Sequence, residues 1–84
     1  MVVVHRAYGY RFVIYTMDHE PAHVHIVGDG QAKVNLAGAA GRPELVFNVG
    51  IKRSDLKRLF AEIVEHRVEM LNAWERIHGH IDRR

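Results

Sequence analysis

Apolar residues recur at every second position through much of the first half of the chain. This spacing is typical of β-strands, whose successive side chains point to opposite faces of a sheet. Runs with this spacing lie at residues 10–16, 23–27, 31–36 and 44–49, and a short run at residues 2–6 that is rich in β-branched valine predicts a further strand. Glycine-containing segments at residues 8–9 and 28–30 separate two pairs of these runs and predict β-hairpins. In the last run, Leu45, Phe47 and Val49 are expected to face the core.

Between about residues 52 and 78 the apolar spacing changes to about 3.6, which predicts one long amphipathic helix. Gly79 is expected to end this helix, because glycine readily adopts the left-handed conformation found at helix C-termini, and residues 79–84 are expected to fray. These elements predict a single α+β domain over residues 1–84. It would hold a four- or five-stranded antiparallel sheet of β-hairpins at about residues 2–49, with the long C-terminal helix packed on one face.

The length and composition of the chain indicate a small domain that does not span a membrane. A chain of 84 residues buries only about 60 to 65% of its unfolded surface, so a homo-oligomer is one expected way of stabilising its small core. No apolar run approaches the roughly 20 residues of a membrane span and no basic leader is present, so a cytoplasmic protein is expected. The absence of cysteine leaves histidine and carboxylate side chains to hold any transition metal.

Histidines cluster before and within the third predicted strand. Pro21 disfavours helix at the residue before it, so residues 18–22 are predicted to form a loop that leads into the strand. His23 and His25 then lie on the same face, because side chains two apart on a strand point the same way. The apolar residues that alternate with them are expected to face the core.

This histidine pair has three possible interpretations. Joined by Asp18 and His19 from the loop, His23 and His25 would form a set of ligands suited to zinc or a similar divalent ion. The two histidines also suit acid–base catalysis on RNA, in which one takes the ribose 2′-hydroxyl proton and the other protonates the leaving oxygen. The third interpretation is a solvated sheet face with neither role, and the sequence leaves all three open.

Two arginines interrupt apolar patterns. Arg11 lies within the second predicted strand, and Arg67 projects from the middle of the apolar stripe of the predicted helix. Each is expected either to pair structurally or extend to solvent, or else to bind an anion, which for Arg11 would be a phosphate or carboxylate near the histidines. In the catalytic interpretation, Arg11 or Arg67 would neutralise the phosphate of the substrate.

The start of the predicted helix is basic, although the helix dipole disfavours cations at that end. Its basic residues are Lys52, Arg53, Lys57 and Arg58. Because stability alone would favour acidic residues there, this pattern indicates an anionic partner, either the phosphates of RNA or DNA or an acidic protein surface. The alternative is a solvated, charged helix end.

Several segments spread over nearly the whole chain form a pattern of their own. They are Gly9-Tyr10-Arg11-Phe12, Asp18-His19-x-Pro21-x-His23-Val24-His25-Ile26, Ala32-Lys33, Asn48-x-Gly50, and a helix that runs to Trp74 and His78-Gly79. This pattern resembles a small bacterial family, the domain of unknown function 4160. The resemblance implies the toxin half of a type II toxin–antitoxin pair, with a small antitoxin partner of the domain of unknown function 2442 type. It implies no particular reaction, and His5 stands where an apolar residue is usual in that family.

Two functions are therefore expected as alternatives. The first is a toxin-like component of a bacterial toxin–antitoxin pair that acts on RNA through the histidine cluster, as a ribonuclease-like enzyme or a metal-dependent hydrolase. The second is a non-enzymatic regulator that binds nucleic acid or protein and whose histidines hold a metal ion. The metal content of the purified protein would help to separate these interpretations.

Overall fold

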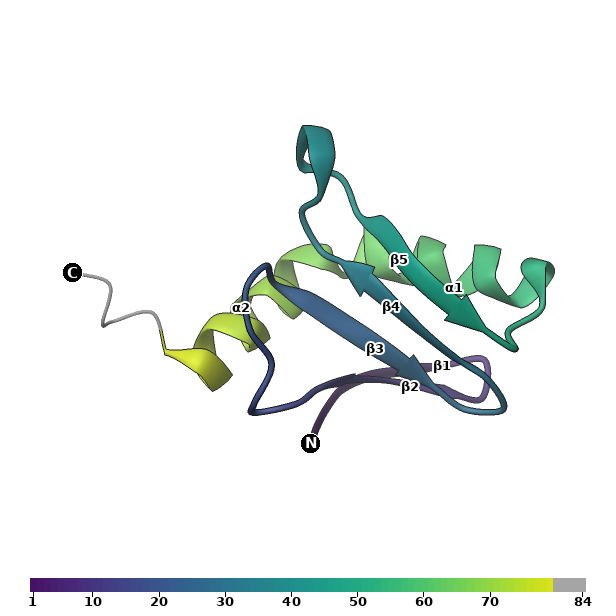
Figure 1. Ribbon diagram of the computed structural model, residues 1–84, viewed down its shortest axis with the longest axis horizontal. Helices are drawn as coiled ribbons and strands as arrows, with labels where there is room; N and C mark the ends of the chain where they lie inside the picture. Colours follow the sequence, from purple (N-terminus) through teal and green to yellow (C-terminus); the bar gives the residue numbers. More distant parts are fainter. Residues whose placement is uncertain (80–84) are drawn as a thin grey trace.

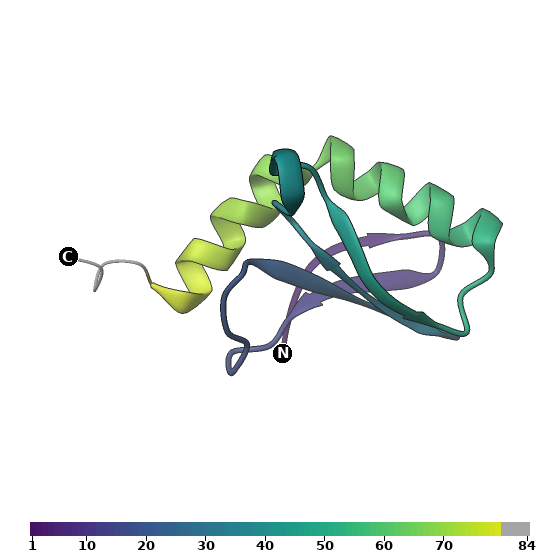
Figure 2. The same cartoon turned by 45° about the horizontal axis from the view of Figure 1, so that its top comes forward.

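The computed structural model describes residues 1–79, which form an antiparallel sheet covered by two α-helices. The strands are β1 Val2–Ala7, β2 Tyr10–Ile14, β3 His23–Val27, β4 Gln31–Asn35 and β5 Glu44–Val49. They lie side by side in chain order, so each strand pairs with the next (Figure 1). The helices α1 (Arg53–Glu65) and α2 (Arg67–His78) lie along one side of the sheet (Figure 2). The predicted α+β class with an antiparallel sheet is confirmed, and we call the sheet face opposite the helices the open face.

Tight turns join two of the strand pairs at the predicted places. Tyr8 and Gly9, between β1 and β2, have φ angles of 53° and 79°, the left-handed conformations that a two-residue hairpin turn requires. Residues 28–30 join β3 to β4. A Cβ atom added to Gly30 would lie 2.5 Å from the carbonyl carbon of Gly50, so glycine allows this turn to pack against the end of β5.

The core lies between the sheet and the helices. Phe12, Val24 and Ile26 on the central strands are fully buried, as are Leu59 and Ile63 on α1. Each side chain of this size stabilises the fold by about 1.5 to 3 kcal/mol when it is fully buried. The strand residues on this face alternate with residues on the open face, which is why the period of two in the sequence predicts the strands correctly.

The prediction of one long helix was wrong, because the helical run breaks at His66. The φ and ψ angles of His66 are −107° and 21°, and the residue ends α1 and precedes α2. Arg67, the first residue of α2, donates from Nε to the carbonyl oxygen of Leu36 and from Nη2 to that of Gly41, each at 2.7 Å. These bonds tie the start of α2 to the β4–β5 loop, so the two helices cross the twisted sheet at different angles (Figure 2). Residues 53–78 contain no glycine or proline, so no local signal marks the break.

The expectation that all three alternating residues of β5 face the core was also wrong. β5 is an edge strand, and Leu45, Phe47 and Val49 are 41%, 40% and 61% exposed. A register shift places Phe47 opposite Lys33 on the open face. It places Leu45 opposite Val34 on the face under the helices. One extra residue in a strand reverses the alternation beyond it, and the apolar pattern alone does not reveal such a bulge.

Helix α2 ends where Gly79 predicts the end of the helix. α2 ends at His78, and Gly79 follows with a φ angle of 63°. Residues 80–84, which make up most of the predicted frayed tail, lie outside the described residues. Among residues 1–79, neither α-helix has the length and apolar character that crossing a membrane requires.

Candidate functional site

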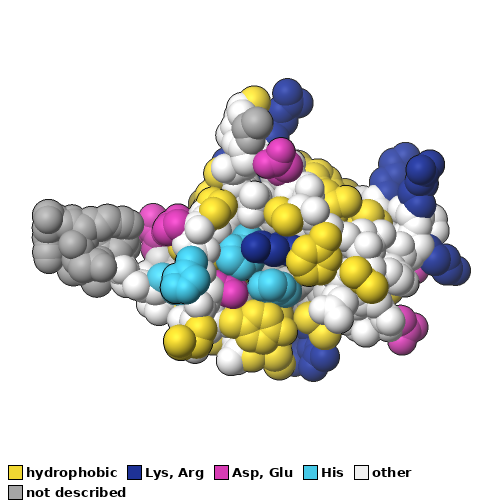
Figure 3. All heavy atoms as spheres, viewed as in Figure 1, with side chains coloured by type: hydrophobic (Ala, Val, Ile, Leu, Met, Phe, Trp, Pro, Cys, Tyr) yellow, Lys and Arg dark blue, Asp and Glu magenta, His cyan; other side chains and the backbone are white. Residues whose placement is uncertain are grey.

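His23 and His25 lie beside each other on β3, as its alternation predicts. Asp18, from the loop between β2 and β3, lies between them, and histidine side chains surround an acidic side chain in the middle of the open face (Figure 3). The Nε2 atoms of His23 and His25 lie 3.2 and 3.5 Å from the same Oδ2 atom of Asp18. The three ligand atoms all lie within 4.8 Å of one another. We call Asp18, His23 and His25 the histidine site.

Backbone groups hold two members of the histidine site in place. The backbone N–H of Tyr15 donates to Oδ2 of Asp18 at 3.0 Å, and the N–H of Asp18 donates back to the Tyr15 carbonyl oxygen at 3.0 Å. Nδ1 of His23 lies 2.8 Å from the carbonyl oxygen of Pro21. Because a carbonyl oxygen only accepts hydrogen bonds, Nδ1 of His23 carries the proton. The Nε2 atom of a neutral His23 therefore presents a lone pair to Asp18.

This arrangement fits a bound cation. A lone pair of His23 facing a carboxylate oxygen is repulsive unless a proton or a cation lies between the two atoms. Nε2 of His25 is buried and makes no hydrogen bond within the described structure. Its nearest acidic atom, Oδ2 of Asp18, lies 3.5 Å away, which is long for a hydrogen bond. An ion bound by all three residues would satisfy both nitrogens. Two imidazoles and one carboxylate are a common ligand set for zinc and leave a coordination position open.

Three further side chains surround the histidine site. The ring of Tyr15 meets that of His25 edge-on, with 4.8 Å between centroids. The ring of Trp74, from α2, lies 5.1 Å from that of His23. Lys33 stands directly opposite His25 on β4 and brings a positive charge to the site. The sequence predicted no role in the site for these three residues. The short β3–β4 turn fixes the strand register, so the position of Lys33 opposite His25 could have been predicted from it. No local signal in the sequence links Trp74 to His23.

The surroundings move the pKa values of two members of the site. Burial raises the pKa of Asp18, but the hydrogen bond from Tyr15 and the two nearby histidines outweigh it and hold the pKa below its ordinary value of 3.8. Burial lowers the pKa of His25 below its ordinary value of 6.5, and the Asp18 carboxylate opposes this only in part. At neutral pH, Asp18 is therefore ionised and His25 neutral, which are the protonation states that metal binding requires.

A family model described as Domain of unknown function (DUF4160) matches residues 9–75, which include the whole histidine site. The chain belongs to the DUF4160 family. No curated protein and no solved structure matches it.

Not every residue predicted for the site of this DUF4160 chain lies within it. His19 is exposed and does not belong to the cluster of ligand atoms that Asp18 forms in the described structure. Arg11 lies on the open face, but opposite Val27 and beside Arg6 of β1, nearer the other end of β3. Arg67 is engaged with backbone carbonyl groups of the β4–β5 loop and has a structural role.

The basic start of α1 lies apart from the histidine site. All four of its basic residues are exposed: Lys52, Arg53, Lys57 and Arg58. α1 begins at the opposite end of the molecule from the β2–β3 loop (Figure 1). The Arg58 guanidinium carbon lies 5.6 Å from the centroid of the Tyr8 ring. Arg53 and Lys57 border an apolar hollow between β5 and α1, which is lined by Leu45, Leu56 and Phe60.

Mild acid should destabilise the metal-free protein partly through His25. The folded-state pKa of His25 lies below 6.5, so between these two pKa values His25 binds more protons in the unfolded chain than in the folded chain. This contribution to the free energy of unfolding is complete above pH 6.5 and is lost as the pH falls through the folded-state pKa. Urea unfolding with a chelator, from about pH 7.5 to about pH 5.5, should show a smaller loss in His25→Gln than in the wild type. The exposed His19→Gln serves as the control, and equal losses in wild type and His25→Gln would contradict the assignment.

Proposed function

We propose that this DUF4160 chain is a cytoplasmic, toxin-like component of a toxin–antitoxin pair. In this proposal the histidine site holds a divalent metal ion, zinc or a similar ion, that serves the hydrolysis of RNA. The observation that carries the metal is the convergence of two imidazole nitrogens, one of them buried without a hydrogen bond, on a single Asp18 oxygen. The toxin-like role rests on the family resemblance, and the site supplies a chemistry for it.

The geometry favours a metal centre over two histidines acting as acid and base. In that mechanism the reacting phosphodiester has to fit between the two imidazoles. Here the carboxylate of Asp18 occupies the space between them, and the ligand atoms lie within 4.8 Å of one another. His23 is also only 3% exposed, so little of its ring is open to a substrate.

The proposed reaction is hydrolysis of a phosphodiester. A divalent ion in the histidine site supplies a Lewis acid for this chemistry. The hydroxyl group of a water molecule binds to phosphorus as the bond from phosphorus to the leaving oxygen breaks. The remaining proton of that water goes to the leaving oxygen. Lys33, opposite His25, would hold positive charge beside the anionic substrate, with Arg11 further along the same face.

The proposed partner is a small antitoxin of the domain of unknown function 2442 type, bound at β5. The support for this surface is an edge strand beside an apolar hollow that Arg53 and Lys57 border. An extended protein segment with apolar and acidic side chains suits such a surface, because it can add a strand to β5 and fill the hollow. A nucleic-acid backbone offers no apolar groups for the hollow. A second copy of the chain bound there would instead produce a homo-oligomer.

The second candidate function is a regulator without enzymatic activity. In this alternative the histidine site holds a structural or sensory ion, and the basic start of α1 binds RNA or DNA. Its support is the exposure of all four basic residues and their separation from the histidine site. Both functions predict a bound ion, but only the first predicts that RNA is cleaved.

Metal analysis of protein purified without a histidine tag tests the site. The double variant His23→Ala/His25→Ala should bind about one equivalent of zinc less than the wild type, because two of the three ligands are lost. Elemental analysis after dialysis against zinc measures this, and circular dichroism checks the fold. His19→Ala is the matched control, since it removes an exposed histidine of the same region. A double variant that is folded and retains the full metal content would overturn the proposed centre.

A further inference from the structure

His5 on β1 faces the helices because of an irregularity in the strand. Val3 and His5 have partners on β2 but Val4 does not, so the register shifts between them. His5 thereby packs beside Phe12, with 5.2 Å between ring centroids. Its Nε2 atom lies 2.8 Å from Oε1 of Glu62 on α1. This contact joins residues 57 positions apart in the chain.

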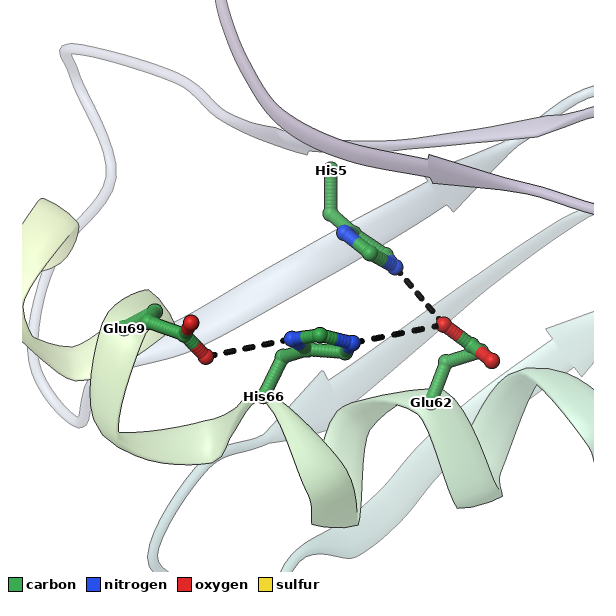
Figure 4. Close-up of polar contacts among 4 residues, drawn as sticks. All are labelled: His5, Glu62, His66 and Glu69. Carbon is green, nitrogen blue, oxygen red and sulfur yellow. Dashed lines mark hydrogen bonds and ion pairs between the residues drawn. The ribbon is translucent and has the colours of Figure 1, made fainter.

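His66, at the break between the helices, points to the same carboxylate. Its Nε2 atom lies 3.7 Å from Oε1 of Glu62, and its ring centroid lies 4.4 Å from that of His5 (Figure 4). The ligand atoms of His5, Glu62 and His66 lie within 4.8 Å of one another. The side chains of His5 and Glu62 are each 22% exposed and that of His66 is 32% exposed, so an ion can reach them from solvent.

Glu69 orients the His66 ring. Its Oε1 atom lies 3.1 Å from Nδ1 of His66, so a carboxylate accepts the proton of that nitrogen (Figure 4). A neutral His66 then presents the lone pair of Nε2 toward Glu62. A carboxylate that fixes the second nitrogen of a histidine ligand in this way is a recurring feature of zinc sites.

We propose that His5, Glu62 and His66 form a second divalent metal site, with Glu69 as the residue that positions His66. A hydrogen bond between His5 and Glu62 accounts for those two residues alone. The i,i+4 spacing places His66 beside Glu62, at a distance too long for a hydrogen bond, but it does not bring His5 from β1 to the same oxygen, where all three ligand atoms lie within 4.8 Å of one another. Two imidazoles and one carboxylate favour zinc over magnesium or calcium, which prefer oxygen ligands.

An ion in this site would have a structural role. It would connect the edge strand β1 to the last turn of α1 and to the residue that separates α1 from α2. The sheet edge and the angle between the two helices would then be fixed together. This inference does not depend on the proposed function, because the site shares no residue with the histidine site.

Zinc binding in the His23→Ala/His25→Ala background isolates the second site. In that background the protein should still bind about one equivalent of zinc, and adding Glu62→Gln should remove it. Adding Glu65→Gln, an exposed glutamate on the same helix, should leave it bound. On zinc addition, NMR should show shifts of the Nε2 resonances of His5 and His66. If the background variant does not fold, Glu62→Gln and Glu65→Gln are compared in the wild-type chain, where the expected loss is again about one equivalent.

The positioning role of Glu69 is tested by the zinc affinity of two further variants. Glu69→Ala should weaken zinc binding at this site by about 10-fold or more, whereas Glu69→Gln, which keeps an acceptor for Nδ1, should weaken it less. Equal zinc binding by the Glu62→Gln and Glu65→Gln proteins, or no binding by the folded background variant, would overturn the second site. Loss of metal from the histidine site alone would leave this inference intact, so the two proposals can fail independently.

Discussion

The double substitution His23→Ala/His25→Ala should abolish the growth arrest that we expect when the chain is expressed in bacteria without its partner. It removes two of three proposed metal ligands and therefore the Lewis acid that the reaction needs. RNA cleavage by the purified protein should fall by at least about 100-fold, since stabilisation by the ion is worth several kcal/mol. Growth curves and cleavage of a labelled RNA measure the two effects, and circular dichroism shows whether the variant is folded.

His19→Ala provides the matched control for this experiment, because it removes a nearby exposed histidine outside the cluster and should leave the arrest unchanged. Arrest that persists in a folded double variant would move the activity away from the histidine site. Growth that is unaffected even by the wild type would count against the toxin-like role and favour the regulator.

The proposed antitoxin surface at β5 can be tested in the same growth assay. Co-expression of an antitoxin of the domain of unknown function 2442 type should restore growth. Arg53→Gln/Lys57→Gln should weaken that rescue, because these residues border the hollow proposed to receive the antitoxin. If the substitutions instead remove RNA binding while rescue is kept, nucleic acid is the ligand of the basic helix start.

Trp74→Ala should reduce the free energy of unfolding by about 3 to 5 kcal/mol, a large share of the roughly 5 to 15 kcal/mol that stabilises a typical domain. Trp74 is 3% exposed, and its ring packs against those of His23 and His78, with 5.1 and 4.0 Å between ring centroids. Its Nε1 atom also donates to Glu20 at 3.3 Å, at the end of the loop that carries Asp18. The substitution should therefore weaken metal binding at the histidine site as well as the fold.

Urea unfolding followed by far-ultraviolet circular dichroism measures this loss, since Trp74 is the sole tryptophan and its fluorescence disappears with it. Trp74→Phe keeps an aromatic ring against His23 and should cost less. Val68→Ala, on the exposed side of α2, should change stability by no more than about 0.5 kcal/mol. A Trp74→Ala protein as stable as the Val68→Ala protein would contradict the expected contribution of the Trp74 ring to the stability of the fold.

Local patterns in the sequence determined much of the sheet and part of the histidine site. The period of two identified the strands, and Tyr8-Gly9 and Gly28-Asp29-Gly30 marked the two tight turns. The same alternation places His23 and His25 on one face without any knowledge of the rest of the fold. These features depend on residues a few positions apart, so their physical causes lie within the segments themselves.

Only the tertiary structure decided which other side chains meet. The turn after β2 brings Asp18 and not His19 to the histidines, and the helix break at His66 follows from contacts of α2 with the β4–β5 loop rather than from a local signal. The meeting of His5 with Glu62 requires both the bulge in β1 and the packing of α1 on the sheet. Contacts between residues far apart in the chain depend on strand register and helix placement, which hydrophobic periodicity does not specify.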